Sequence, residues 1–248
     1  MEINRMALAK IASSVFLVLA MFGQADVGSN IRDGARPESD TGRDAGRKPA
    51  EVLHFLGLQE NAIVMDVMAS SGYYTEVLAH AVGSEGTVYA QNPPMMLKYR
   101  DGYYDKALAQ RLKGGRLTNV VRLDRDMGDL GIPSESVDLA ITALNFHDIY
   151  NSAGESAALE LLSQVYGLLK PGGVFGVIDH AGNPEGDNNR LHRMDEAAMR
   201  GLIARSAFQL DGSGDLLRNP KDDRTGGVFA PDIRGNTDRF LFRLRKPK

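Results

Sequence analysis

Two histidines, each next to an aspartate, stand at the ends of two apolar segments of this chain. His147 and Asp148 follow "SVDLAITAL", and Asp179 and His180 lie near the end of "VFGVIDHA". A neutral imidazole near its own pKa can accept a proton from a nucleophile. Two imidazoles with two carboxylates can also bind a metal ion, and the spacing permits this without requiring it. We assign His147, Asp179 and His180 to catalysis and expect no resident metal ion. A metal-dependent enzyme or a hydrolase built on the same residues is an alternative.

A strand, a turn and a helix are predicted where the chain reads "VMDVMASSGYYTEVLAHAV". Nucleotide-binding proteins usually have three glycines in such a turn, because glycine lets the backbone approach the ligand and adopt unusual dihedral angles. Here only Gly72 is present, and Met68 and Ser70 occupy the other two positions. Ser70 is small and can donate a hydrogen bond, whereas the side chain of Met68 either narrows the pocket or packs beneath the turn. We expect the turn to bind a ligand; the alternative is a Rossmann-like turn without one.

Apolar segments of strand length alternate with amphipathic segments of helix length from residue 48 onwards. The expected strands are residues 62–68, 86–92, 119–124, 136–144, 174–181, 208–217 and 238–246, and the expected helices are residues 48–58, 73–82, 103–112, 155–169 and 191–206. Such alternation indicates βαβ units and a mainly parallel sheet with helices on both faces. No helix is expected between the last two strands, which should therefore pair antiparallel at one edge. The predicted fold class is α/β, a Rossmann-like three-layer sandwich.

Polar residues follow the C-terminal end of each of the first five expected strands. They are Asp66, Gln91, Asn92, Asp124, Asp126, Asn145, His147, Asp148, Asp179 and His180. In a doubly wound sheet, ligands bind outside the carboxyl ends of the strands. The convergence of these polar groups on one edge of the sheet therefore predicts a binding cleft.

Three segments, in their order along the chain, resemble class I S-adenosylmethionine-dependent methyltransferases over nearly all of residues 48–248. They are "VMDVMASSGYYTEVLA", "RDMGDLGIPSESVDLAI" and "LLKPGGVFGVIDH". The pieces "RKPAEVLHFLGL", "NFHD" and "DLLRNPKDD…RGNTDRF" are most similar to a little-characterised bacterial group of predicted, often exported, methyltransferases. The resemblance implies a seven-stranded sheet with an antiparallel last strand, and S-adenosylmethionine as the cofactor.

The resemblance also implies a role for individual polar positions. Asn92 stands where the family usually has an acid that holds the ribose hydroxyls, and an amide lacks the charge that strengthens such bonds. Asp126 would reach the adenine amine, with Met127 against the ring. The first turn would lie along the methionine part of the cofactor, and residues 143–147 would border the methyl group and the substrate. The residues implied at the cofactor are Asp66, Met68, Ser70, Gly72, Asn92, Asp126, Met127 and Asn145.

The first 25 residues have the three parts of a secretory signal peptide. Arg5 and Lys10 precede the uncharged apolar stretch "IASSVFLVLAMF", and "GQA" offers small residues before a cut after Ala25. This stretch is too short to span a bilayer as a helix, so we expect no stable membrane anchor after cleavage. The alternative is a short amphipathic or buried N-terminal helix. Residues 26–46 are polar and unpatterned, which predicts a flexible lead-in before a methyltransferase-like domain at residues 47–248. The mature protein is expected to be periplasmic or secreted.

Composition narrows the chemistry and the partners. The formal charge of -3 is mild, and no block of lysine and arginine indicates nucleic-acid binding. The chain has no cysteine, which excludes disulfides, thiolate zinc sites and cysteine nucleophiles. The G-x-G-x-x-G spacing of NAD-dependent dehydrogenases is missing, which disfavours that class.

These observations favour an S-adenosylmethionine-dependent methyltransferase that acts on a small molecule or an envelope component. The alternative is a non-catalytic exported binding protein on the same scaffold, because the glycine turn is weakened and the methyl donor is made in the cytoplasm. The oligomeric state and the methyl acceptor are not predicted.

Two further groups of residues receive a structural interpretation. His54, His80 and His192 lie on expected helices away from the strand ends, and we interpret them as non-catalytic. The long charged connection at residues 215–239 is expected to be an internally salt-bridged loop that completes the fold. The alternative is a substrate clamp in which Arg218 or Arg234 binds an anionic group.

Overall fold

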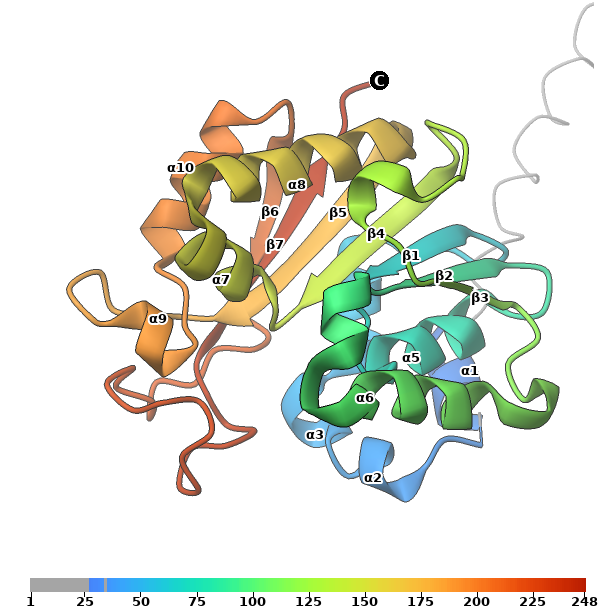
Figure 1. The fold of residues 1–248 in the computed structure, drawn as a ribbon, viewed down its shortest axis with the longest axis horizontal. Coiled ribbons are helices and arrows are strands. Elements are labelled where there is room, and N and C mark those ends of the chain that lie inside the picture. Colours follow the sequence, from blue (N-terminus) through green and yellow to red (C-terminus); the bar gives the residue numbers. More distant parts are fainter. Residues whose placement is uncertain (1–26, 34) are drawn as a thin grey trace, which may run out of the picture.

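Seven strands form one sheet in the computed structural model, which describes residues 27–33 and 35–248. The order across the sheet is β3-β2-β1-β4-β5-β7-β6 (Figure 1). The first five strands pair parallel, and β7 runs antiparallel to both β5 and β6. The predicted sheet is confirmed, and of the last two strands β7 lies inside it and β6 forms the edge. The strands are β1 Ile63–Val67, β2 Thr87–Gln91, β3 Val120–Leu123, β4 Val137–Ala143, β5 Leu169–His180, β6 Gln209–Gly214 and β7 Arg239–Arg245.

Helices cover both faces of the sheet, as the alternation of segments predicts (Figure 1). Buried side chains of α8 and α10 pack on one face, and those of α1, α4 and α5 pack on the other. The helices are α1 Val27–Asp33, α2 Glu38–Thr41, α3 Asp44–Arg47, α4 Pro49–Leu56, α5 Tyr73–Val82, α6 Pro94–Leu112, α7 Phe146–Asp148, α8 Gly154–Leu168, α9 Asn188–Leu191 and α10 Glu196–Arg205, with short 3-10 turns η1 Lys113–Gly115 and η2 Met127–Asp129 and a π-helical turn η3 Ile149–Ala153.

The central strand β1 is buried on both sides. Val64 packs with the α4 and α5 side chains, whereas Met65 and Val67 pack on the α8 face. This alternation follows from the two-residue period of a strand, and burial on both faces explains the nearly continuous apolar sequence. The strand order reverses between β1 and β4, so the residues that follow these two strands lie at the edge where α/β proteins bind ligands.

Within the expected lead-in, residues 27–33 and 35–46 contain short helices that pack against the rest of the chain. Residues 27–33 form α1, which buries Ile31 against the α4 and α5 side chains. Arg36 donates to both carboxylate oxygens of Asp44 (2.6 and 3.0 Å), and the Tyr73 hydroxyl donates to Asp44 (2.6 Å). Arg36 and Asp44 pair within the segment and Tyr73 binds it from α5, so the sequence of the segment has no apolar pattern that reveals these contacts.

The helix expected at residues 191–206 is shorter in the structure. Asp195 accepts a hydrogen bond from the amide of Ala197 (3.0 Å) and caps α10, which therefore begins at Glu196. Before this cap, His192 has a left-handed backbone with φ 54°. Met194 continues as an extended residue that bridges to Ala181 at the end of β5. Because α10 begins only at Glu196, His192 lies outside that helix and near the carboxyl edge of the sheet.

Within residues 27–33 and 35–248, no helix is both long and apolar enough to cross a membrane. The expected signal peptide at residues 1–25 lies outside the described residues.

Candidate functional site at the carboxyl edge

The turn after β1 keeps a glycine-like backbone although two of its three glycines are replaced. Met68, Ser70 and Gly72 have φ values of 54°, 55° and 84°. A non-glycine residue in this left-handed region costs about 1–2 kcal/mol, because Cβ comes close to the carbonyl oxygen. Two more strained non-glycine residues, Leu144 (φ 65°) and His192 (φ 54°), lie at the same edge of the sheet. Strain of this kind persists where surrounding structure enforces it, and it is concentrated at functional sites.

Three amide side chains hold the turn in this conformation. Gln91 accepts a hydrogen bond from the Met68 amide (3.0 Å), and Asn145 donates to the Met68 carbonyl (2.9 Å). Asn92 accepts from the Ser70 amide (2.8 Å) and donates to the Ser70 carbonyl (3.2 Å). The turn is therefore fastened to the ends of β2 and β4, and these bonds offset the strain of its two non-glycine residues.

The Met68 side chain packs into the core. It is 6% exposed and belongs to the cluster on the α8 face that also contains Phe146. Of the two roles considered for this side chain, packing beneath the turn agrees with the structure. Gly72, in contrast, needs its hydrogen, since a Cβ there would lie 2.8 Å from a Leu108 methyl group of α6.

Asn92 and Asp66 have partners that differ from their expected cofactor contacts. Asn92 is fully buried, and its amide is used to hold Ser70, so the structure does not present it to a ribose. Asp66 accepts a hydrogen bond from the Thr75 hydroxyl (2.7 Å) and fixes the first turn of α5 to β1. Burial raises the pKa of Asp66 to about 7, against the opposing hydrogen bond from Thr75. Asn92 and Asp66 therefore stabilise the turn and the start of α5 from their buried side.

Asp126 and Met127 lie as expected beyond β3. Asp126 precedes η2 and is exposed, and among the described residues no hydrogen-bond partner of its carboxylate is found. Met127 is half-buried and packs against the core cluster that contains Met68. A free carboxylate next to an apolar thioether can accept a hydrogen bond from an amine and pack against a flat ring.

His147 and Asp179 form a buried pair at the ends of β4 and β5. One Asp179 oxygen is 2.7 Å from Nδ1 of His147, and the other accepts the His147 backbone amide at 2.7 Å. Burial lowers the pKa of His147, but the charges of Asp179 and Asp148 outweigh it and raise the pKa to about 10. Asp179 thus orients the imidazole, a pairing across two strand ends that the sequence did not indicate.

His180 has the opposite electrostatic setting. Its Nδ1 is 2.6 Å from the hydroxyl of Thr237, and its ring centroid lies 5.9 Å from that of His147. Burial and the positive charge of Arg239 lower its pKa well below the usual value. The two imidazoles expected at this edge are therefore brought together, one favouring the charged form and the other the neutral form.

His192 is a site residue that the sequence reasoning missed. Its Nδ1 lies 3.2 Å from an Asp148 oxygen, which is also 3.2 Å from Nε2 of His147. The rings of His147 and His192 meet edge to face, with centroids 5.7 Å apart. Asp195, in "MD", is a typical helix N-cap residue. If the helix is taken to begin after it, His192 is predicted to lie outside the helix.

Arg47 is a second missed residue. Its guanidinium lies 4.4 Å from the centre of the Tyr73 ring, and none of the described carboxylates forms an ion pair with it. Burial lowers the pKa of Arg47. Its positive charge opposes the rise in pKa that burial causes in Asp66 of β1 and in Tyr74 at the start of α5. Arg47 is therefore a cation beside the turn with capacity to bind an anion.

The charged loop at residues 215–239 forms ion pairs within itself and with Arg193 and Glu196 outside it. Arg193 is fully buried and makes two hydrogen bonds to Asp222 (2.9 and 3.0 Å). Arg218 pairs with Glu196 (2.6 Å), and Arg224 pairs with Asp238 (2.7 Å). These contacts agree with the expectation of a salt-bridged loop that completes the fold.

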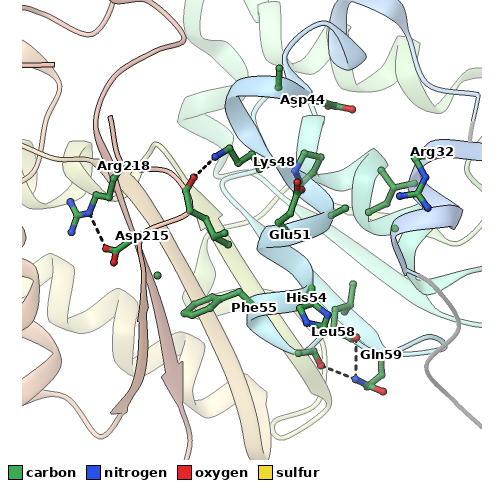
Figure 2. A pocket seen from close by; sticks show the side chains of 18 of the residues that line it. Arg32, Asp44, Lys48, Glu51, His54, Phe55, Leu58, Gln59, Asp215 and Arg218 are labelled. Atoms are coloured by element: carbon green, nitrogen blue, oxygen red, sulfur yellow. Dashed lines mark hydrogen bonds and ion pairs between the residues drawn. The ribbon is translucent and has the colours of Figure 1, made fainter. Parts of the chain in front are cut away.

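A separate groove of about 1380 Å³ opens between the α1 and α4 helices and the segment after β6. Figure 2 shows Lys48 and His54 on one side of it, and Asp215 and Arg218 on the other. Lys48 reaches across to the Leu216 carbonyl (2.9 Å). None of the residues expected at the cofactor or in catalysis lines this groove, so it is distinct from the site at the carboxyl edge.

Comparisons with known proteins support the fold. No family model matches the chain, and no curated protein matches it in sequence. A solved S-adenosylmethionine-dependent methyltransferase from Aquifex aeolicus is 20% identical, with a TM-score of 0.60 over 88% of this chain and 97% of its own. The cyclase SpnF is 16% identical, with a TM-score of 0.59 over 82% of this chain and 81% of its own.

A further neighbour, titled a "possible exported protein" from Bordetella parapertussis, is 14% identical, with a TM-score of 0.53 over 82% of this chain and 68% of its own. Because a cyclase is among these neighbours, similarity of fold alone leaves the reaction open. The chain thus has the Rossmann-like fold of solved S-adenosylmethionine-dependent methyltransferases.

Proposed function

We propose that the protein is an S-adenosylmethionine-dependent methyltransferase that acts on a small molecule or an envelope component. The observation that carries the proposal is the turn after β1. All three glycine positions keep positive φ angles although two are occupied by Met68 and Ser70. A chain that had lost its ligand would have no need for this strained backbone, and three amide side chains would not be required to hold it.

The donor set of the site fits this cofactor at both ends. The Arg47 guanidinium, which forms no ion pair with a carboxylate of residues 27–33 or 35–248, suits the carboxylate of the methionine part. Arginine binds carboxylates with two parallel hydrogen bonds. Asp126 would accept a hydrogen bond from the adenine amine, with Met127 packed against the ring. The ribose has no equivalent partner, because the Asn92 amide is engaged with Ser70.

The bound cofactor would supply an electrophilic methyl group. The chain's own contribution is to place an acceptor atom in line with that group, which is the main requirement of methyl transfer. Asp179 fixes the ring of His147 through Nδ1 and the backbone amide. His180 lies beside it at the same edge of the sheet, and together these groups border the position where the acceptor would bind.

Titration calorimetry on the full-length protein tests the proposal. We expect micromolar binding of S-adenosylmethionine and S-adenosylhomocysteine, and a loss of at least tenfold in affinity with Asp126→Ala. Asp129→Ala, which removes another exposed acid three residues further along, is the matched control and should bind normally. Failure of the folded protein to bind either compound would rule out the methyltransferase.

We also propose that the protein is exported. The support is the charged, apolar and small-residue pattern of residues 1–25. The neighbour titled a possible exported protein agrees with this proposal. Mass spectrometry of the protein recovered from a periplasmic fraction should give a new N-terminus at Asp26, and an intact Met1 would contradict cleavage.

A further inference from the structure

We propose that His147, Asp148 and His192 form a binding site for a divalent transition-metal ion, with Zn²⁺ as the representative ion. Two imidazole nitrogens and one carboxylate oxygen face one another at the carboxyl edge of the sheet. The three ligand atoms all lie within 4.8 Å of one another. All five histidines of the chain are in the described residues, so the N-terminal segment adds no competing imidazole.

The distances suit metal ligands better than hydrogen bonds between charged groups. An Asp148 oxygen lies 3.2 Å from Nε2 of His147 and 3.2 Å from Nδ1 of His192. A tetrahedral Zn²⁺ with bonds of about 2.0 Å holds its ligand atoms about 3.3 Å apart. Charge-assisted hydrogen bonds between nitrogen and oxygen are shorter, at about 2.7–2.9 Å, and the neighbouring contact of His147 with Asp179 has this shorter length, 2.7 Å.

Asp179 completes the arrangement as the partner of a ligand. A carboxylate accepts hydrogen bonds, so Nδ1 of His147 carries the proton that points to Asp179. Nε2 becomes the ligand atom when the metal ion displaces its proton. The second Asp179 oxygen accepts the His147 amide at 2.7 Å, which fixes the residue as well as its ring. Metal-binding histidines almost always have such a carboxylate or carbonyl partner.

Hydrogen bonds of the two residues after His192 hold it at the site, although its own backbone is strained. His192 has a φ of 54°, which is costly for a residue with a Cβ. Asn151 donates to the Arg193 carbonyl (2.8 Å), and Met194 donates to the His180 carbonyl (2.8 Å). The ring of Phe229 lies against His192, with centroids 5.1 Å apart.

The site is open to solvent on one side. The side chains of Asp148 and His192 are 55% and 43% exposed, whereas that of His147 is 4% exposed. A metal ion can therefore enter, and it would keep at least one position for water or another ligand, as in catalytic zinc sites. Under the proposed function, and only under it, this open position would take an oxygen of the methyl acceptor beside His180.

The ligand types select the class of metal. Two imidazoles with one carboxylate suit Zn²⁺ and neighbouring first-row ions, while Mg²⁺ and Ca²⁺ prefer sites made of oxygen atoms. We therefore expect Zn²⁺ and Co²⁺ to bind and Mg²⁺ to compete poorly. Co²⁺ offers a direct readout through its visible absorption when bound in this geometry.

Metal titration of the full-length protein, freed of metal with a chelator, tests this site. We expect one equivalent of Zn²⁺ to bind in competition with a chromophoric chelator. His192→Asn should weaken binding at least tenfold and remove the Co²⁺ absorption band, and it should fold because His192 is half-exposed. Asp179→Asn should weaken binding by about 10–100-fold without removing a ligand. His54→Asn, which changes an exposed histidine of α4, is the control and should bind like the wild type.

Two results would overturn the proposal. One is a folded wild-type protein that takes up no Zn²⁺, and the other is an unchanged affinity in His192→Asn. Because the titration contains no S-adenosylmethionine, it is independent of the cofactor experiment. Binding of metal without binding of S-adenosylmethionine would support the metal site and contradict the proposed function. Binding of S-adenosylmethionine without binding of metal would support the proposed function and contradict the metal site.

Discussion

Replacing Met68 and Ser70 by the glycines of a typical nucleotide-binding turn should change stability in opposite directions. Both residues have φ near 55°, so glycine would relieve about 1–2 kcal/mol of backbone strain at either position. Glycine also costs about 0.5–1 kcal/mol through the greater freedom of the unfolded chain. The backbone effects nearly cancel at both positions, and the side chains decide the outcome.

The two side chains differ in what they contribute. Met68 is 6% exposed within the core cluster of the α8 face, and truncating such a methionine costs about 2–5 kcal/mol. Ser70 is half-buried and makes one weak hydrogen bond from its hydroxyl, to the Met68 carbonyl at 3.3 Å. We therefore expect Met68→Gly to lower the free energy of unfolding by about 2–4 kcal/mol, and Ser70→Gly to change it by less than about 1 kcal/mol, in the stabilising direction.

Equilibrium unfolding in urea, followed by circular dichroism, measures both changes. Asn61→Gly is the control for the backbone effect alone, because Asn61 is exposed and has a φ of 60°. A Met68→Gly protein as stable as the wild type would refute the reasoning, since it would show that the methionine side chain adds nothing beneath the turn.

Two further predictions concern buried charges. Asp66 has a folded-state pKa of about 7 against 3.8 when exposed, so the folded protein holds a proton that the unfolded chain releases, and stability falls as pH rises from about 4 to 7. Asp66→Asn should remove a penalty of up to about 4 kcal/mol at pH 8 and very little at pH 4; equal effects in denaturant titrations at both pH values would contradict this. Arg193→Met should leave the Asp222 carboxylate buried without its partner and cost about 3–5 kcal/mol, whereas Arg190→Met, at an exposed position, should cost little. Thermal unfolding measures this difference, and a loss below about 1 kcal/mol for Arg193→Met would show that this pair does not anchor the closing loop.

The order of strands and helices could be predicted because it depends on local patterns. Strand β1 reads as a compact apolar run, and α5 ends at Val82, directly before the Gly83 at which the amphipathic pattern stops. Polar residues collected after each strand also indicated the edge that carries the site. These signals lie within short stretches of sequence, and the periods of strands and helices make them readable.

The detailed partners at the site could not be predicted in the same way. Asn92 was expected at a ribose, but a turn with two missing glycines needs outside support, and Asn92 supplies it. The segment at residues 26–46 has no apolar pattern, yet Asp44 accepts a hydrogen bond from the Tyr73 hydroxyl of α5. Such contacts join residues far apart in sequence, and their distances are set only when the chain packs.

The sequence by itself determined the α/β architecture, the position of the turn and the convergence of polar groups at one edge, because periodicity and strand ends are local properties. Tertiary structure alone decided that Met68 and Ser70 keep left-handed backbones and that His192 joins His147 and Asp148. The physical reason is that a strained backbone angle is maintained only by neighbours from other strands. Likewise, a cluster of imidazoles and carboxylates forms only where separate segments of the chain come to lie side by side.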